Sequence, residues 1–155
     1  ERGLYSGRRL APTAHHDHAV VAARVPKAVV CLLSAAAFHE LGTQVPHAVW
    51  IAMPPRTWSP QLSAPPIEVV RFSGARYDDG VEEHRVEGVV VRVYSVAKTV
   101  VDLFRYRNKL GLDVALEALR ESRRGRRRCS VAELGRIAER SKVLSAMRPY
   151  LESLA

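Results

Sequence analysis

Cysteine is scarce in this chain of 155 residues, and neither Cys31 nor Cys129 belongs to a CxxC pair or to a zinc-ligand spacing. A disulfide framework and a cysteine-based zinc site are therefore not indicated. Cys31 lies inside an apolar run, where a free thiol behaves as a small hydrophobic side chain. This usage is typical of proteins in a reducing compartment, so we expect a cytoplasmic protein.

Long apolar runs are also missing. The longest uncharged run, residues 28–38, is far shorter than the ~20 residues that a membrane helix needs. No stretch resembles a signal peptide, and we expect no membrane partner. Apolar residues make up 47% of the chain and charged residues 26%, which predicts an ordinary globular domain with a core of its own.

The common catalytic signatures do not occur: the sequence contains no GxSxG, no P-loop and no GxGxxG. Consecutive histidines in His15–His18 converge poorly on one metal ion, which favours a solvated loop. The carboxylates of residues 77–84 could suit a metal-dependent nuclease, but Arg85 and Glu87 interrupt the required pattern, which favours a solvated acidic turn. We therefore expect no enzyme activity, no cofactor and no metal.

Strand and turn signals dominate the first two thirds of the chain. Apolar runs bounded by prolines predict strands over residues 48–53 and 67–73. Residues 84–95 predict a hairpin with Glu87-Gly88 at its turn. A helix is expected over residues 31–42, where Gly42 has the place of a C-terminal cap, and a shorter one over residues 18–25.

From Ser95 onward the pattern is helical. Ser95 is a good N-cap, Asp113 is placed to cap the next helix, and Ser130 with Glu133 forms a capping-box pattern. Pro149 is expected to break or kink the last helix. The order of elements predicts an α+β fold, with a small mixed or antiparallel sheet packed against a helical C-terminal part.

Charge is distributed unevenly along the chain. The formal net charge is +8, and residues 96–155 account for +7 of it, with fourteen Lys and Arg against seven Asp and Glu. Such an asymmetry is typical of proteins that bind a polyanion, most often nucleic acid. A soluble surface that is simply rich in arginine is the alternative, and charge alone does not distinguish the two.

Four charged residues of the helix after Ser95, from Lys98 to Lys109, follow a 4-3-4 spacing that places them on one stripe opposite the apolar face. The stripe is either a solvated surface, with an i,i+4 ion pair worth ~0.3 kcal/mol, or part of a phosphate-contacting patch. The candidate phosphate contacts are Lys98, Arg105, Arg107, Lys109, Arg123, Arg124, Arg126, Arg127 and Arg128.

Three stretches of the sequence resemble the AbiEi-type abortive-infection antitoxins, which are bacterial transcriptional regulators of type IV toxin–antitoxin systems. They are residues 25–54, residues 70–121 and residues 147–154. The most specific part is YSVAKTVVDLFRYRNKLGLDVALEALRE, residues 94–121, and SAAAFHELGTQVPHAVWIAMP, residues 34–54, is the second. The resemblance covers the chain from about residue 22 to residue 154.

The resemblance implies a two-part protein. An N-terminal winged helix would bind operator DNA, and a C-terminal domain with a basic surface would assist repression and toxin neutralisation. Residues 1–14 then correspond to the tail of the winged helix and residues 15–155 to the antitoxin domain, so the recognition helix would lie upstream. The implied partners are operator DNA and a nucleotidyltransferase-like toxin. The resemblance implies no catalytic residues, and a homodimer is possible.

A second function class remains open from the residues themselves. The loop Pro54–Pro66 is long and rich in proline, and it carries Trp58. Loops of this length are often functional, and tryptophan is a residue type that anchors protein interfaces. In this alternative the chain is a protein–protein interaction module that docks a toxin or a second copy of itself without direct DNA binding.

Overall fold

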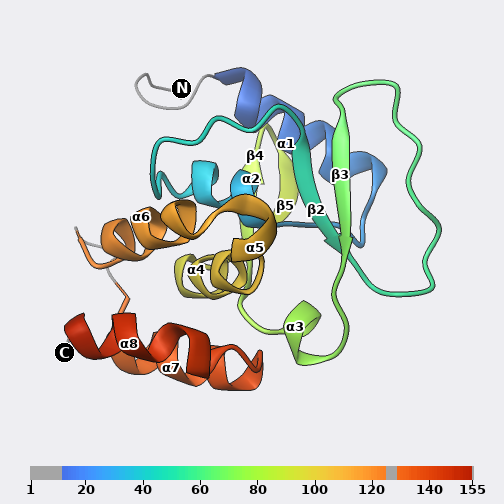
Figure 1. Ribbon diagram of the computed structural model, residues 1–155. Coiled ribbons are helices and arrows are strands. Elements are labelled where there is room, and N and C mark those ends of the chain that lie inside the picture. The colour runs from blue at the N-terminus through green and yellow to red at the C-terminus, as the bar shows by residue number, and fades with distance from the viewer. Residues whose placement is uncertain (1–11, 125–128, 155) are drawn as a thin grey trace.

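The computed structural model describes residues 12–124 and 129–154 (Figure 1). Its elements follow in the order α1 (Pro12–Arg24), β1 (Val29–Val30), α2 (Leu32–Phe38), β2 (Val49–Met53), β3 (Ile67–Arg71), α3 (Ala75–Asp78), β4 (Val81–Val86), β5 (Val89–Tyr94), α4 (Val96–Arg105), α5 (Arg107–Leu110), α6 (Leu112–Ser122), α7 (Val131–Arg140) and α8 (Leu144–Leu154).

The strands form one five-stranded sheet in the order β3-β2-β1-β5-β4. The pairs β1–β2 and β4–β5 are antiparallel, whereas β2–β3 and β1–β5 are parallel. The sheet is therefore mixed, and the expected α+β class is confirmed. The two-residue strand β1 sits at the centre of the sheet and joins its two halves.

The β4–β5 hairpin forms where the sequence predicted it. Val86 pairs with Val89 across the turn, and the two turn residues, Glu87 and Gly88, have φ angles of 52° and 79°. Positive φ at both central positions is the geometry of the tight turn whose twist matches antiparallel strands. Glycine adopts it without strain, which explains its place here.

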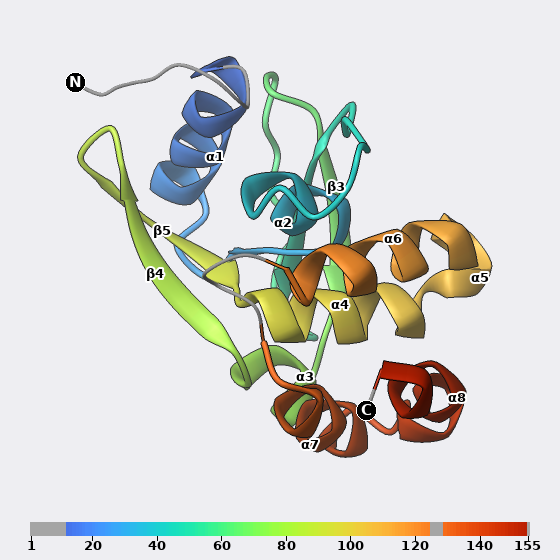
Figure 2. The ribbon, with the colours of Figure 1, turned by 90° about the vertical axis from the view of Figure 1, so that its left-hand side faces the viewer.

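Helices cover both faces of the sheet. All five residues of β2 are buried, because α1 packs on one face and α2 and α4 lie over the other (Figures 1 and 2). Val21 and Val25 of α1 join Ile51 in one apolar cluster. Trp50 and its neighbours on the opposite face belong to a larger cluster that includes the helices α4 to α8.

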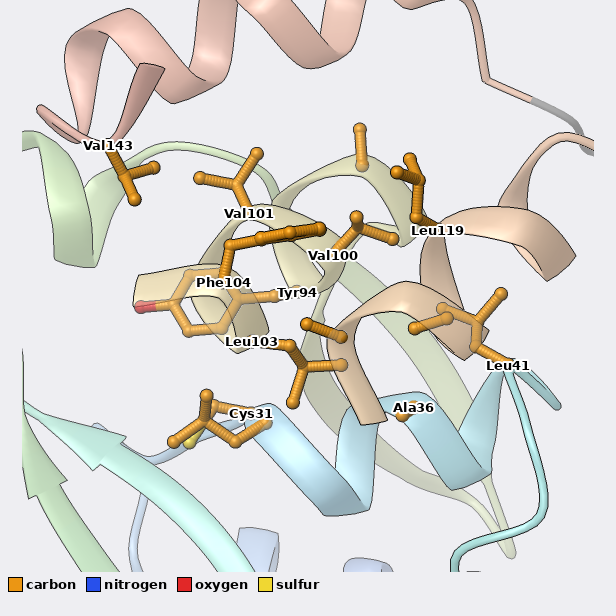
Figure 3. Packing of buried hydrophobic residues seen from close by; sticks show 14 of the residues in the cluster. Cys31, Ala36, Leu41, Tyr94, Val100, Val101, Leu103, Phe104, Leu119 and Val143 are labelled. Carbon is orange, nitrogen blue, oxygen red and sulfur yellow. The ribbon is translucent and has the colours of Figure 1, made fainter. Parts of the chain in front are cut away.

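Helix α4 is the centre of this larger core. It contacts α2, α6, α7 and α8, and every residue from Ala97 to Phe104 is buried. Figure 3 shows side chains of this helix directed to different neighbours, with Leu103 toward α2 and Val101 toward the α7–α8 layer. The hydroxyl of Ser95 accepts a hydrogen bond from the backbone N–H of Lys98 at 3.2 Å, so the predicted N-cap is confirmed.

Several local predictions were wrong. Residues 12–18 form the first turns of α1, so His15–His18 is helical, and His18 is 4% exposed rather than solvated. Residues 12–14, which were expected to belong to the tail of a winged helix, form the start of α1, and the rest of that expected tail, residues 1–11, lies outside the described residues. Helix α2 ends at Phe38, before Gly42, because the chain turns at Glu40, whose φ is 60°.

The later helices also differ from expectation at their ends. Helix α6 begins at Leu112, after Gly111 in a positive-φ conformation, so Asp113 lies in the first turn and makes no capping hydrogen bond. Ser130 does cap α7, and its hydroxyl accepts from the N–H of Glu133 at 3.0 Å. Helix α8 continues through Pro149 without a break.

Candidate nucleic-acid interface

The first predicted phosphate contact, Lys98, is not on the surface. Its side chain is 0% exposed, and its amine donates a hydrogen bond to Asp102 at 2.6 Å. The first two members of the expected stripe, Lys98 and Asp102, are buried, because α4 packs against α2, α6, α7 and α8 and Lys98 lies over the rings of Phe72 and Tyr94. Lys98 therefore cannot contact a phosphate in this structure.

The Lys98–Asp102 pair is held inside an aromatic shell. The Lys98 amine lies 4.1 Å from the ring centroid of Tyr94 and 4.9 Å from that of Phe72. Burial raises the pKa of Asp102 to about 6, although the charge and hydrogen bond of Lys98 act in the opposite direction. The second carboxylate oxygen of Asp102 has no hydrogen-bond partner within the described part of the chain.

Three predicted cations gather where α4 passes into α5, and we call Arg105, Arg107 and Lys109 the α4–α5 cationic edge. The Arg105 guanidinium lies 5.6 Å from the ring centroid of Tyr106, and the Lys109 amine lies 5.7 Å from that of Trp50. The Arg107 guanidinium donates to the carbonyl of Phe104 at 2.9 Å, which fixes its stem.

No described carboxylate forms an ion pair with a member of this edge. Lys109 is exposed, and the two arginines are half-buried. These three cations can donate hydrogen bonds to phosphate oxygens without first breaking a salt bridge to a described carboxylate.

The remaining predicted cations are placed differently. The Arg123 guanidinium donates to the backbone carbonyl of Cys129 at 2.6 Å and closes the loop between α6 and α7. Arg124 lies 3.5 Å from the Glu121 carboxylate. The other three, Arg126, Arg127 and Arg128, lie outside the described residues. The structure thus brings together three of the nine candidates and assigns local contacts to three others.

The acidic segment is tied to the helical layer. Arg140 on α7 forms a two-pronged contact with Asp79, with nitrogen–oxygen distances of 2.5 and 3.2 Å, and Glu82 lies 2.9 Å from His84. Within residues 12–124 and 129–154, no three His, Cys, Asp or Glu side chains are grouped so as to hold a metal ion. None of the helices in these ranges has the length and apolarity of a bilayer span.

The loop between β2 and β3 presents Trp58, which is 94% exposed. Arg71 at the end of β3 braces this loop, because its guanidinium donates to the Pro54 carbonyl at 2.9 Å, to the Thr57 hydroxyl at 2.5 Å and to the Ser59 hydroxyl at 3.1 Å. These hydrogen bonds fix the loop that presents the Trp58 side chain to solvent. Sequence reasoning identified Trp58 but missed Arg71, because nothing in the spacing links a strand end to a loop twelve or more residues away.

Comparison with known proteins adds no relative. No family model matches this chain, and no curated protein matches it.

Proposed function

We propose that this chain is the C-terminal domain of an AbiEi-type antitoxin and transcriptional regulator, a binding protein rather than an enzyme, and that its α4–α5 cationic edge contacts DNA phosphates. The observation that supports the DNA contact most directly is that Arg105, Arg107 and Lys109 follow one another at the α4–α5 junction and form no ion pair with a described carboxylate. Phosphate contacts position a protein on DNA and do not read its sequence, so operator choice would come from an upstream winged helix.

The net charge of residues 96–155 supports the same role. An excess of +7 attracts a polyanion from a distance, while the edge offers side chains in contact range. Fewer residues can contact phosphate than the sequence predicted. Lys98 is paired with Asp102 inside the core, and Arg123 and Arg124 already contact neighbouring groups of the chain.

A salt titration tests the DNA contact. We would measure the dissociation constant of a duplex of about 20 base pairs between roughly 50 and 200 mM salt, where each phosphate contact adds about 0.9 to the log–log slope. Replacing Arg107 and Lys109 by Gln should lower that slope by about 1.8. The matched control replaces Arg136 and Arg148, which are exposed on α7 and α8, and should change the slope little. Equal slopes for both double variants would remove DNA from the role of this edge.

The regulatory role needs a test in cells. The chain, joined to its upstream coding sequence, would be expressed together with the nucleotidyltransferase-like protein encoded beside it. We expect growth arrest by that protein to be relieved and transcription from the operon's promoter to fall. Unrelieved arrest together with unchanged transcription would contradict the assignment, whatever the DNA titration gives.

A second function, protein–protein docking, is favoured by the braced exposure of Trp58. Trp58 is 94% exposed, and it lies on a loop that three hydrogen bonds from Arg71 hold in place, so the loop loses little backbone freedom when a partner covers the tryptophan. Light scattering and co-purification with the neighbouring gene product would be compared for the wild type and for Trp58→Ala. If this loop docks a partner, complex formation falls in the variant while its free energy of unfolding stays the same.

A further inference from the structure

An open hollow lies at the beginnings of β2 and β3, on a part of the molecule that the proposed DNA contact does not use. Its volume is about 610 Å³, within the range of sites that hold small ligands or several side chains. One wall comes from α1 and α2, another from the loop of residues 42–48, and the third from Pro65 and Pro66.

The charge of this hollow is opposite to that of the chain. Asp17 and Glu40 contribute carboxylates to its lining, and no Lys or Arg is present among the described residues that line it. The whole chain carries +8, so a surface with two carboxylates and no cation is a local reversal. Carboxylates that face an open hollow favour a cationic ligand by direct attraction and by charged hydrogen bonds.

A buried histidine adds a second, independent sign of a ligand site. His18 forms part of the lining yet is 4% exposed, and its Nδ1 atom has no hydrogen-bond partner within the described residues. Burial lowers the pKa of His18 to about 4, so its imidazole is neutral at physiological pH and does not offset the carboxylates. Buried polar atoms normally have partners, and the missing partner of this nitrogen distinguishes the wall of the hollow from an ordinary packed surface.

Apolar residues also line the hollow. Val45 is 83% exposed, and Pro46, Pro65 and Pro66 belong to the same lining, with Pro66 exposed, Pro46 half-buried and Pro65 buried. Proline rings are rigid, so they bind flat or aliphatic groups without loss of side-chain freedom. A ligand that matches both the carboxylates and the apolar lining has a cationic head and an apolar body.

The rim is fixed by a contact from α6. The backbone N–H of Thr43 donates to the Glu117 carboxylate at 3.3 Å, and the Thr43 hydroxyl donates to the same group. Gly42, with φ of 129°, allows this approach, because a Cβ atom there would lie 2.7 Å from a Glu117 oxygen. These contacts hold the loop in place before any ligand arrives, which lowers the entropic cost of binding.

We propose that this hollow binds an arginine-bearing segment of a partner protein, in which the guanidinium meets Asp17 and Glu40 and a neighbouring apolar residue packs against Val45 and the prolines. Arginine suits the site better than lysine, since its planar guanidinium can bridge two carboxylates and stack on flat rings. The proposal does not depend on DNA binding, because the α4–α5 cationic edge attracts anions and this hollow attracts cations.

Fluorescence anisotropy with a labelled Gly-Val-Arg-Leu-Gly peptide tests it. The reference peptide carries citrulline in place of arginine, which keeps the shape and removes the charge. We expect the arginine peptide to bind at least about tenfold more tightly, the loss expected when a charged hydrogen-bonded contact is removed. The double variant Asp17→Asn/Glu40→Gln should abolish that preference. The control Glu68→Gln/Glu83→Gln removes two exposed carboxylates from β3 and β4 and should retain it.

Two other results would overturn the proposal. Equal binding of the two peptides, or no binding of either, means that the hollow does not select a cation. Competition by butylguanidinium at the same concentration as the arginine peptide means that the site takes a small free cation and not a protein segment. Competition that requires much higher concentrations of butylguanidinium supports a peptide that uses both the carboxylates and the apolar lining.

Discussion

The buried pair Lys98–Asp102 predicts an unusual response to mutation. Both side chains are at most 1% exposed, and they meet at 2.6 Å. Lys98→Met removes the charge and the hydrogen bond that stabilise the buried Asp102 carboxylate, so the group either stays charged without a partner or takes up a proton that the unfolded state would release. Breaking a buried ion pair from one side costs about 3–5 kcal/mol, which is a large fraction of the 5–15 kcal/mol that stabilises a typical domain. We therefore expect a strongly destabilised variant.

Removing both charges should reverse that loss. In the double variant Lys98→Met/Asp102→Leu, apolar side chains of similar size fill the space between α4 and the rings of Phe72 and Tyr94. Replacing a whole buried ion pair in this way is often neutral or stabilising by about 1–4 kcal/mol. The double variant should thus be at least as stable as the wild type, although each single variant is much less stable.

The pH dependence sharpens the test. The folded-state pKa of Asp102, about 6, is higher than its ordinary value of 3.8, so the folded state binds the proton more tightly. Its contribution to stability is greatest below pH 3.8 and is lost as the pH rises through about 6, by ~3 kcal/mol. The cost of Lys98→Met should accordingly be large at about pH 7 and should shrink at about pH 4, where the carboxyl group is protonated and needs no counter-ion.

Urea unfolding followed by tryptophan fluorescence and circular dichroism measures these free energies, with the m-value as the check on two-state behaviour. Two results would refute the reasoning. If Lys98→Met is as stable as the wild type at neutral pH, the pair is not buried as described. If the double variant loses as much as the two single variants together, the two residues stabilise the fold through separate contacts and not as a pair.

Three further predictions concern local features. The folded-state pKa of His18, about 4, lies below its ordinary value of about 6.5. The stability that neutral His18 contributes above pH 6.5 is therefore lost as the pH falls toward 4, by ~3 kcal/mol. His18→Leu should remove this loss, which urea unfolding at the two pH values measures. Gly88→Ala should cost about 1 kcal/mol, since φ there is 79° in open space, whereas Gly135→Ala within α7 should stabilise by about 1 kcal/mol; thermal unfolding of both variants checks the sign of each change. Ser130→Ala removes the cap of α7 and should lower the unfolding free energy by about 1 kcal/mol, and an unchanged midpoint in urea would contradict the capping role.

The features that sequence reasoning found are those that neighbouring residues determine. The turn at Glu87-Gly88 needs two adjacent residues with positive φ, and the caps at Ser95 and Ser130 need a hydroxyl three residues before an N–H. Each depends on fewer than five consecutive residues, so a pattern in the chain is sufficient. The strand β2 was equally accessible, because prolines bound a continuous apolar run.

The features that it missed depend on residues far apart in the chain. A 4-3-4 stripe of charge ordinarily indicates a solvated helix face, but α4 is enclosed by helices contributed from both sides of it, and its Lys98–Asp102 pair faces Phe72 from β3's end. Helical periodicity describes one helix and not the number of elements packed around it. The strand β1 was missed for another reason, since two residues cannot display a period.

A resemblance that lies mainly in buried residues supports a shared core more strongly than a shared function. The stretch of residues 94–121 is the most specific part of that resemblance, yet its first half is almost wholly interior: Ala97 to Phe104 are all buried. Such residues are constrained by packing, and proteins that share a packed core can bind different partners. The predicted phosphate contacts of this stretch that are not buried lie where α4 ends, at Arg105, Arg107 and Lys109. The proposed phosphate contact of these residues therefore depends on that short edge, and the salt titration of Arg107 and Lys109 tests this contact separately from the fold.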